Sequence, residues 1–224
     1  MKLSAVKVLF FIVAIALQVK AETFDIACAG NSLTRHAILA GVWDWESGMA
    51  ATDETLDYAH ALRDKVAAIS PLVTTLSTLP AIQVADATNI LTTTTNLYDL
   101  LVLQTGENDL FDATFQSDFA DALTLAEARL KAGGLVIATG DWYDNGGKVS
   151  WQKSTVEAKG DPFLFVDLSV LKVAATFGYG GPYSDAGVAT HPNNRGHSDI
   201  AVRIFGAWIN TQVIPKPRYG VGIR

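Results

Sequence analysis

An apolar run at residues 98–104, YDLLVLQ, is the feature that most constrains how this chain can fold. A strand with one face in water alternates apolar and polar residues, whereas a parallel strand covered by helices on both faces is apolar almost throughout. The run therefore predicts a buried strand of a parallel sheet. Residues 135–139, LVIAT, have the same character and predict a second buried strand.

Strand and helix patterns alternate along the rest of the chain. Further strands are expected at residues 23–29 and 163–168. Apolar residues at three- and four-residue spacing, or weaker signs of it, predict helices at residues 55–69, 115–131, 151–159, 170–177 and 196–211. The helix at 115–131 is expected to be closed by Gly133 and Gly134. The threonine-rich region 70–96 gives poor signals and suggests only a short strand at 81–84.

This alternation implies a parallel sheet between two helical layers. We therefore expect an α/β fold, a three-layer α/β/α sandwich with about five parallel strands, in one domain over residues 22–224. The first strand should lie inside the sheet. Cys28 on that strand is the only cysteine, so an intrachain disulfide is impossible, and we expect its side chain to be buried.

The first 21 residues have the pattern of an export signal. Lys2 and Lys7 lead into an apolar run at residues 8–17, and Val19-Lys20-Ala21 offers a small-x-small cleavage site. The run is about ten residues long, about half of what a membrane span needs. We expect a secreted or periplasmic protein that has no stable association with a membrane.

The charge balance argues against a nucleic-acid partner. Removal of residues 1–21 takes away three lysines and no acid, so the formal net charge falls from −6 to −9. Binding to phosphates requires clustered basic residues, and the sequence has no such cluster.

Three segments contain residues that can take part in catalysis, and the predicted fold places all three at the carboxyl edge of the sheet. In open parallel sheets, ligands bind beyond the carboxyl ends of the strands. GNSLT (residues 30–34) follows the first strand, GEND (106–109) follows the strand at 98–104, and His191 precedes the last helix. A serine hydrolase needs a serine hydroxyl, an imidazole to take its proton and donors for the oxyanion, and these segments supply all three.

These segments, in this order, resemble the blocks of the SGNH, or GDSL-type, hydrolases, and the resemblance spans roughly residues 24–209. It implies a flavodoxin-like fold and hydrolysis of acyl esters by a serine mechanism. By the match, Ser32 in GNSLT would be the nucleophile and Asn108 in GEND an oxyanion donor. Gly48 in SGMAA would be a second donor, through its backbone, and His191 in GVATHP would be the base.

One position departs from the family pattern. The aspartate that usually orients the histidine lies three residues before it, and here that residue is Val188. A backbone carbonyl or Asp185 could orient His191 instead, and we favour the carbonyl. Two other functions stay open: a binding protein that has lost the chemistry, and an acyltransferase that uses the same serine.

Three tryptophans are expected near this edge of the sheet: Trp43, Trp45 and Trp142. They could stack on sugar rings or acyl chains of a substrate, or they could simply cap the core. With export and an acidic surface, they favour a short-chain acyl ester, such as an acetylated carbohydrate or another small ester, as substrate.

The remaining histidines are expected to have minor roles. His36 and His60 are interpreted as structural, with His36 near the pocket mouth, and His197 as a surface residue where the last helix starts. No histidine pair has helical spacing with a carboxylate nearby, so no metal site is expected. No cofactor is expected either, because the glycines at 178–181 do not open a helix after a strand.

Overall fold

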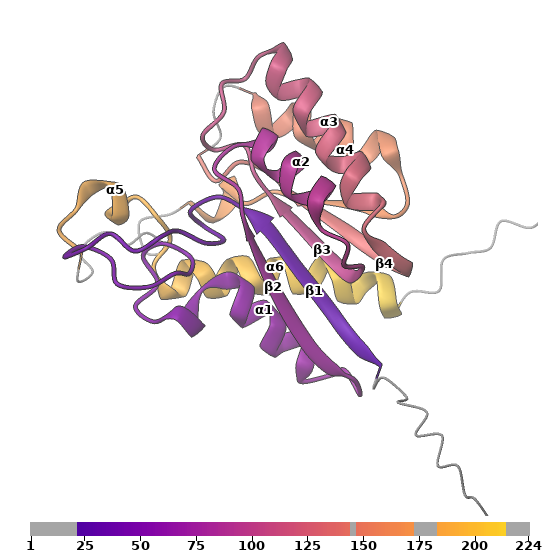
Figure 1. The fold of residues 1–224 in the computed structure, drawn as a ribbon, viewed down its shortest axis with the longest axis horizontal. Coiled ribbons are helices and arrows are strands. Elements are labelled where there is room, and N and C mark those ends of the chain that lie inside the picture. Colours follow the sequence, from indigo (N-terminus) through magenta and orange to yellow (C-terminus); the bar gives the residue numbers. More distant parts are fainter. Residues whose placement is uncertain (1–21, 144–146, 173–182, 214–224) are drawn as a thin grey trace, which may run out of the picture.

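Five parallel strands form one sheet at the centre of the computed structural model, which describes residues 22–143, 147–172 and 183–213 (Figure 1). The strands are β1 (Thr23–Gly30), β2 (Val73–Pro80), β3 (Tyr98–Gln104), β4 (Leu130–Thr139) and β5 (Phe163–Val166). Their order is β2-β1-β3-β4-β5, and every neighbouring pair is parallel. The first strand therefore lies inside the sheet, as the sequence predicts.

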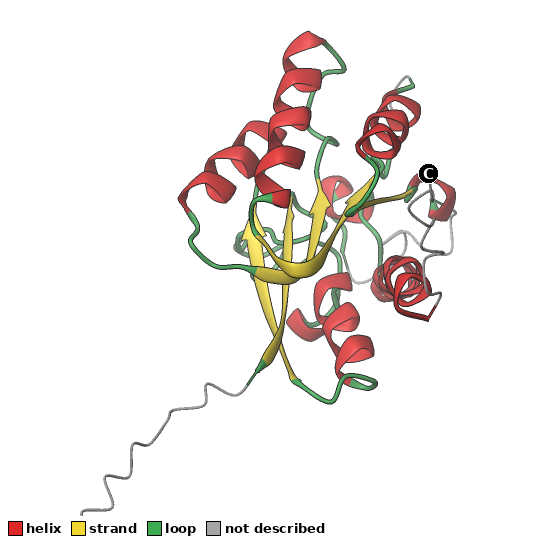
Figure 2. Cartoon of the chain, turned by 90° about the vertical axis from the view of Figure 1, so that its right-hand side faces the viewer, coloured by secondary structure: helices red, strands yellow, loops and turns green. Residues whose placement is uncertain are grey.

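Helices cover both faces of the sheet, which gives the predicted three layers (Figure 2). The helices on one face are α1 (Tyr58–Ala67) and α6 (Asn194–Val213), and those on the other are α2 (Val84–Thr93), α3 (Ala113–Glu127) and α4 (Lys148–Lys159). Alternate residues of β1 face the two layers: Ile26 and Cys28 pack with α1 and α6, and Ala27 and Ala29 with α2 and α3. Cys28 is fully buried, as predicted.

Three short helices complete the described elements: η1 (Glu54–Leu56), η2 (Ser169–Leu171) and α5 (Ala186–Ala189). Of the predicted helix at 170–177, residues 170 and 171 belong to η2 and Lys172 follows as its C-cap. Residues 173–177 lie outside the described residues, as do the predicted export signal and the glycines at 178–181. Within the described ranges, no helix is both long enough and apolar enough to cross a membrane.

The region 70–96 folds differently from the short strand expected at 81–84. The strand is β2, and α2 begins at Val84 after a capping box formed by Gln83 and Asp86. β2 is an edge strand whose residues are partly buried or exposed, so threonines suit it and no apolar run marks it.

The paired glycines lie inside a strand and do not close the preceding helix. α3 ends at Glu127, and β4 has already begun when it reaches Gly133 and Gly134. Gly133 has φ +81°, and the pairing of β4 with β3 shifts register here. A side chain at Gly134 would lie 2.8 Å from the Tyr98 carbonyl oxygen. These glycines therefore allow the backbone of β4 to form a local irregularity at this register shift.

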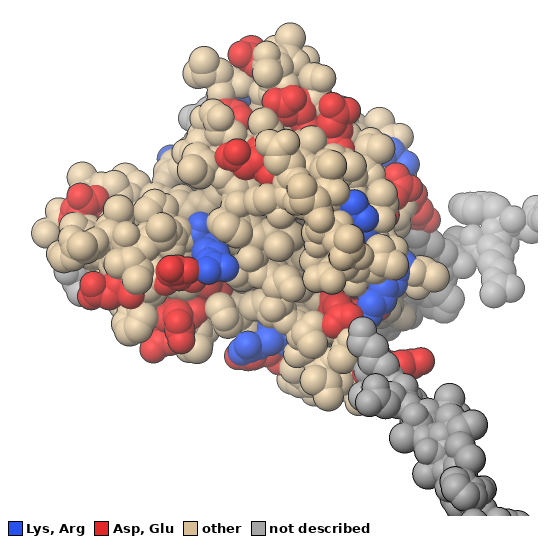
Figure 3. Space-filling model, in the orientation of Figure 1, with Lys and Arg blue, Asp and Glu red and all other residues tan. Residues whose placement is uncertain are grey.

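Acidic side chains are spread over the face drawn in Figure 3, and the lysines and arginines there form small groups, several of them beside acids. No extended basic stripe crosses this face. The picture agrees with the negative net charge of the sequence.

Candidate active site

Ser32 lies in a tight turn directly after β1, at the carboxyl edge of the sheet. The N–H groups of Thr34 and Arg35 donate to the Asn31 carbonyl at 2.8 and 2.9 Å, which closes the turn. A side chain at Gly30 would overlap the Gln104 carbonyl oxygen of β3, so only glycine lets the chain leave the sheet here. The turn brings the Ser32 hydroxyl to the wall of a cavity of about 490 Å³.

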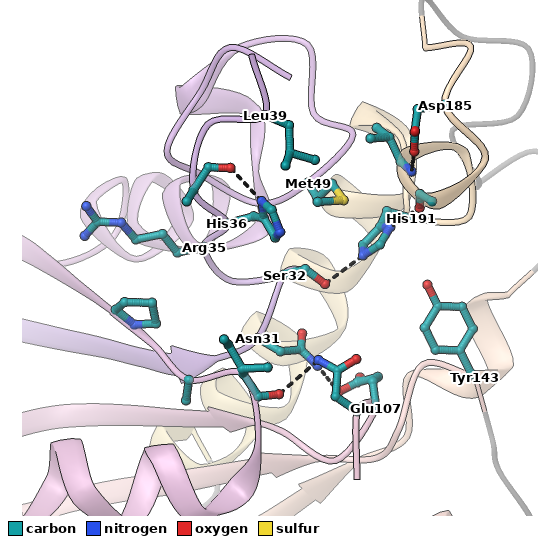
Figure 4. Close-up of a pocket in the computed structure, with 17 residues that line it drawn as sticks. Asn31, Ser32, Arg35, His36, Leu39, Met49, Glu107, Tyr143, Asp185 and His191 are labelled. Carbon is teal, nitrogen blue, oxygen red and sulfur yellow. Dashed lines mark hydrogen bonds between the residues drawn. The ribbon is translucent and has the colours of Figure 1, made fainter. Parts of the chain in front are cut away.

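The Ser32 hydroxyl and the His191 imidazole face each other in this cavity (Figure 4). Ser32 Oγ lies 2.7 Å from His191 Nε2, and His191 Nδ1 lies 2.8 Å from the carbonyl oxygen of Gly187. A carbonyl can only accept, so Nδ1 carries the proton. That tautomer leaves the Nε2 lone pair free to accept the serine proton.

Asp185, the other residue considered for orienting His191, has a different partner. Its carboxylate accepts from the Val188 N–H at 3.0 Å and caps the first turn of α5. The Val188 side chain is buried against Trp43 and Met49. The structure thus places a carbonyl, and not a carboxylate, against Nδ1 of His191.

Burial lowers the pKa of His191 to about 4, and the hydrogen bond to Gly187 opposes this only in part. The imidazole is consequently neutral at neutral pH. A neutral imidazole with a free Nε2 lone pair has the protonation state of a general base.

Asn108 lines the same cavity, on the loop after β3. Its Nδ2 donates one hydrogen bond to the Ile82 carbonyl at 2.9 Å, and the second hydrogen of the amide remains for another acceptor. Within the described ranges, the Ser32 N–H donates no hydrogen bond. Both groups are therefore available to donate a hydrogen bond to a ligand beside Ser32.

Gly48 does not take the oxyanion role that the resemblance implies. Its N–H donates to the buried Asp57 carboxylate at 3.1 Å and is not available to a substrate. A side chain here would lie 2.5 Å from the Leu33 carbonyl oxygen and 2.7 Å from the His197 ring. The glycine is needed for close packing beneath the serine turn.

His197 is fully buried, so its assignment to the surface was wrong. Its Nδ1 accepts from the Tyr58 N–H at 3.2 Å, and its Nε2 donates to the Met49 carbonyl at 3.0 Å. The sequence held a signal for this, because His197 lies three and four residues before Ile200 and Ala201 on the apolar stripe of α6. His36 lines the cavity, and His60 forms a pair with Asp57 at 2.9 Å.

Two of the three candidate tryptophans belong to the core. Trp43 and Trp142 are completely buried, so neither can stack on a substrate. Trp45 is 36% exposed but lines a second hollow, which shares Arg35 with the cavity of Ser32. Among the tryptophans, tyrosines and phenylalanines that the structure describes, Tyr143 lines the cavity itself (Figure 4).

Glu107 in the GEND segment has a structural role that the sequence does not predict. Its carboxylate accepts from Asn31 Nδ2 at 2.5 Å, Gln104 Nε2 at 2.6 Å and the Trp142 N–H at 3.0 Å. Burial, followed by the nearby Asp141 carboxylate, raises the pKa of Glu107 to about 7. No residue pattern predicts the contacts with Asn31 and Trp142, because these two partners lie 76 and 35 positions away in the sequence.

Lys148 was also missed, since a lysine is rarely fully buried. The buried Nζ donates to the carbonyls of Gly106 and Asp109 at 2.5 and 2.7 Å and lies 3.0 Å from the Asp141 carboxylate. It therefore holds the loop between β3 and α3 on both sides of Asn108.

One side of the cavity is polar and includes Ser32, Asn108 and His191. The other side is apolar and is made by Leu39, Met49, Pro80, Ala81 and Ile82. No group of three or more potential metal ligands occurs in the part of the chain that the structure describes. The arrangement suits attack by the Ser32 hydroxyl on a small electrophile with an apolar group.

No protein-family model matches this chain, and no curated protein matches it. Solved structures do. The chain is similar to a two-domain esterase (CEX) active on acetylated mannans, with a TM-score of 0.62 and 14% identity over 92% of this chain and 55% of that one. It is also similar to the salicylyl-acyltransferase SsfX3 of a tetracycline biosynthetic pathway, with a TM-score of 0.57 and 12% identity over 87% of this chain and 56% of that one.

A third similar structure is a member of the lipolytic G-D-S-L family from Veillonella parvula, with a TM-score of 0.51 and 15% identity over 84% of this chain and 99% of that one. The chain thus spans about half the length of the first two proteins and nearly all of the third. At these identities the likeness concerns the fold. The chain has the three-layer fold of the SGNH, or GDSL-type, hydrolases.

Proposed function

We propose that this protein is a serine esterase in which Ser32 and His191 form a catalytic dyad. The observation that carries the proposal is the 2.7 Å contact between Ser32 Oγ and His191 Nε2, with Nδ1 held by the Gly187 carbonyl. The fold supports it, because the similar structures include esterases and an acyltransferase.

The geometry supports a two-step reaction. His191 Nε2 takes the Ser32 proton while Oγ attacks the ester carbonyl, and the Ser32 N–H and the Asn108 amide stabilise the oxyanion. The imidazolium then protonates the leaving alcohol, which leaves an acyl-enzyme. The same imidazole activates a water molecule that releases the acid and restores Ser32.

We consider it less favoured that the protein is an inert binding protein, although Val188 replaces the aspartate that usually orients the histidine. An aspartate in this position serves chiefly to hold the imidazole in the correct tautomer and to stabilise the imidazolium. The Gly187 carbonyl meets the first requirement through its 2.8 Å contact with Nδ1. The imidazolium is stabilised only by the dipole of this carbonyl and not by a negative charge, so we expect a slower enzyme and not an inactive one.

Substitution of the nucleophile tests the proposal. Ser32→Ala should lower kcat for a short-chain aryl ester by at least about 10³-fold, with the melting temperature nearly unchanged. Ser117→Ala, at an exposed position of α3, is the matched control and should leave both values unchanged. Undiminished hydrolysis by the Ser32→Ala variant would contradict the assignment of Ser32 as the nucleophile.

We propose short-chain acyl esters as substrates, with acetylated carbohydrates foremost. The fold shared with an esterase active on acetylated mannans supports the carbohydrate, and the apolar wall of the cavity suits an acyl group. Comparison of kcat/KM for acetylated mannan, an aryl acetate and an aryl octanoate tests this. A preference for octanoate over both acetates would contradict the short acyl group.

Acyl transfer is a second candidate, because the acyltransferase SsfX3 shares the fold. It would use the same acyl-enzyme and deliver the acyl group to a sugar hydroxyl instead of water. The ratio of acylated sugar to free acid, measured with an aryl acetate as donor, separates the two activities.

A further inference from the structure

We propose that Glu107 is a positioning residue for the nucleophile, and that Asn31 and Glu107 form a matched amide–carboxylate pair that holds the serine turn. The inference rests on the proposed esterase function. Glu107 does not contact Ser32 itself but binds Asn31, the residue before it.

Glu107 joins three segments that end at the carboxyl edge of the sheet. One of its oxygens, Oε1, accepts from Gln104 Nε2 of β3 and from the Trp142 N–H after β4, and Oε2 accepts from Asn31 Nδ2 after β1. Three donors converge on one side chain that, when ionised, can only accept. Figure 4 shows Asn31 and Glu107 together below Ser32.

The Asn31 side chain accepts a hydrogen bond through its oxygen and donates one through its nitrogen. Its Oδ1 accepts from the Leu33 N–H at 3.1 Å, and its Nδ2 donates to Glu107 at 2.5 Å. Ser32 lies between Asn31 and Leu33, so the first bond spans the backbone of the nucleophile and the second ties Asn31 to Glu107. Any rotation or displacement of Asn31 moves Ser32 relative to His191 Nε2.

Asn31 and Glu107 are also matched in charge. The block that GNSLT resembles has aspartate where this chain has Asn31. An aspartate here would bring a buried carboxylate into contact with the half-buried carboxylate of Glu107, which is costly. In this chain the negative charge beside the serine turn lies at position 107, and position 31 carries a neutral amide that donates to it.

This reading predicts that the pair can be reversed. In the double variant Asn31→Asp, Glu107→Gln, the side-chain oxygen of the introduced glutamine can still accept from Gln104 and Trp142, and its amide can donate to the new carboxylate. The Leu33 N–H keeps its acceptor. Either single variant, in contrast, opposes two acceptors or two donors.

The pH profile gives a second readout. The network needs the Glu107 carboxylate ionised, and the pKa of Glu107 is raised to about 7, whereas that of His191 is lowered to about 4. Among the described residues, the charged groups near Glu107 are Asp141, which follows β4, and Lys148 of α4, which is bound to Asp141. Activity of the wild type should therefore rise between about pH 6 and 8.

The experiment measures kcat/KM against pH for an aryl acetate with four proteins: wild type, Asn31→Asp, Glu107→Gln and the double variant. We expect each single variant to lose on the order of 10²-fold, mainly in kcat, as a misplaced nucleophile would. The double variant should recover to within about tenfold of wild type. In Glu107→Gln, which has no carboxylate at either position, the acid limb should move from near pH 7 toward the His191 value of about 4.

A double variant no better than the single variants would overturn the inference, and so would an acid limb that stays near pH 7 in every variant. If the double variant does not fold, as judged by circular dichroism, Glu107→Gln alone decides through its acid limb. A wild type that neither hydrolyses the ester nor reacts with a fluorophosphonate would overturn the proposed function itself, which is a different outcome.

Discussion

A neutral carbonyl orients His191 in this site, and that changes which substitutions should matter. The Gly187 oxygen belongs to the backbone, so no side-chain replacement removes it directly. Because the same carbonyl sets the tautomer, the imidazole needs no carboxylate to serve as a base. The dyad therefore depends on the path of the chain through α5 more than on any acid.

Asp185→Asn should accordingly change kcat by less than about fivefold. Asparagine is as good an N-cap as aspartate, so the cap of α5 is retained. If Asp185 instead oriented His191, the loss would approach the roughly 10⁴-fold known for a serine protease with this change. Steady-state kinetics with an aryl acetate distinguish these results.

The tryptophans should separate into a core residue and a surface residue. Trp142→Ala should lower the free energy of unfolding by about 3–5 kcal/mol, because it empties a fully buried site. Trp45→Ala should cost less than about 1 kcal/mol. Urea titrations measure both, and equal losses would contradict the different burial of the two rings.

Trp45 is also the one candidate tryptophan still able to touch a long substrate. If a carbohydrate chain extends past Arg35 into the second hollow, Trp45→Ala should raise KM for acetylated mannan and leave KM for an aryl acetate unchanged. Unchanged KM for both substrates would remove Trp45 from the binding site.

At the scale of single residues, the sequence predicted the members of the site better than their partners. Ser32, Asn108 and His191 do line one cavity. Gly48 has a different partner, because its N–H meets a buried carboxylate that no local pattern reveals. Glu107 contacts Asn31 across 76 positions of the sequence, and such contacts follow from the fold alone.

At the scale of elements, α4 anchors the loop between β3 and α3 through one buried lysine. Lys148→Met should lower the free energy of unfolding by about 3–5 kcal/mol, because it leaves the Asp141 carboxylate and two carbonyls without their cation. Activity should fall as well, since Asn108 lies in that loop.

Lys153→Met is the matched control, on the exposed side of the same helix, and should change stability by less than about 0.5 kcal/mol. Adding Asp141→Asn to Lys148→Met should recover part of the loss, because it removes the buried charge. A loss no larger than that of Lys153→Met would refute the anchoring role of Lys148.

Elements with both faces buried were predictable from sequence, and elements at the margins were not. Helices cover both faces of β3, so its apolar run was unambiguous. β2 lies at an edge and is rich in threonine, which hides its period. Gly133 and Gly134 resembled a helix end because the same residue type serves helix ends and strand irregularities.

At the scale of the whole molecule, the alternation of strands and helices predicted the three-layer fold, and β1 begins at Thr23. If the predicted export signal is cleaved after Ala21, only one residue precedes the sheet. We expect the exported protein to begin at Glu22, as N-terminal sequencing would show. A start within β1 would contradict the signal assignment, because it would remove part of a central strand.

The most direct test of the central claim is reaction of the purified protein with a fluorophosphonate, followed by mass spectrometry of the labelled peptide. The dyad predicts one adduct on Ser32, lost in Ser32→Ala and slowed at least about 10²-fold in His191→Ala, which lacks the base. Wild-type protein that hydrolyses esters but carries its label elsewhere, or labels equally fast without His191, would contradict it.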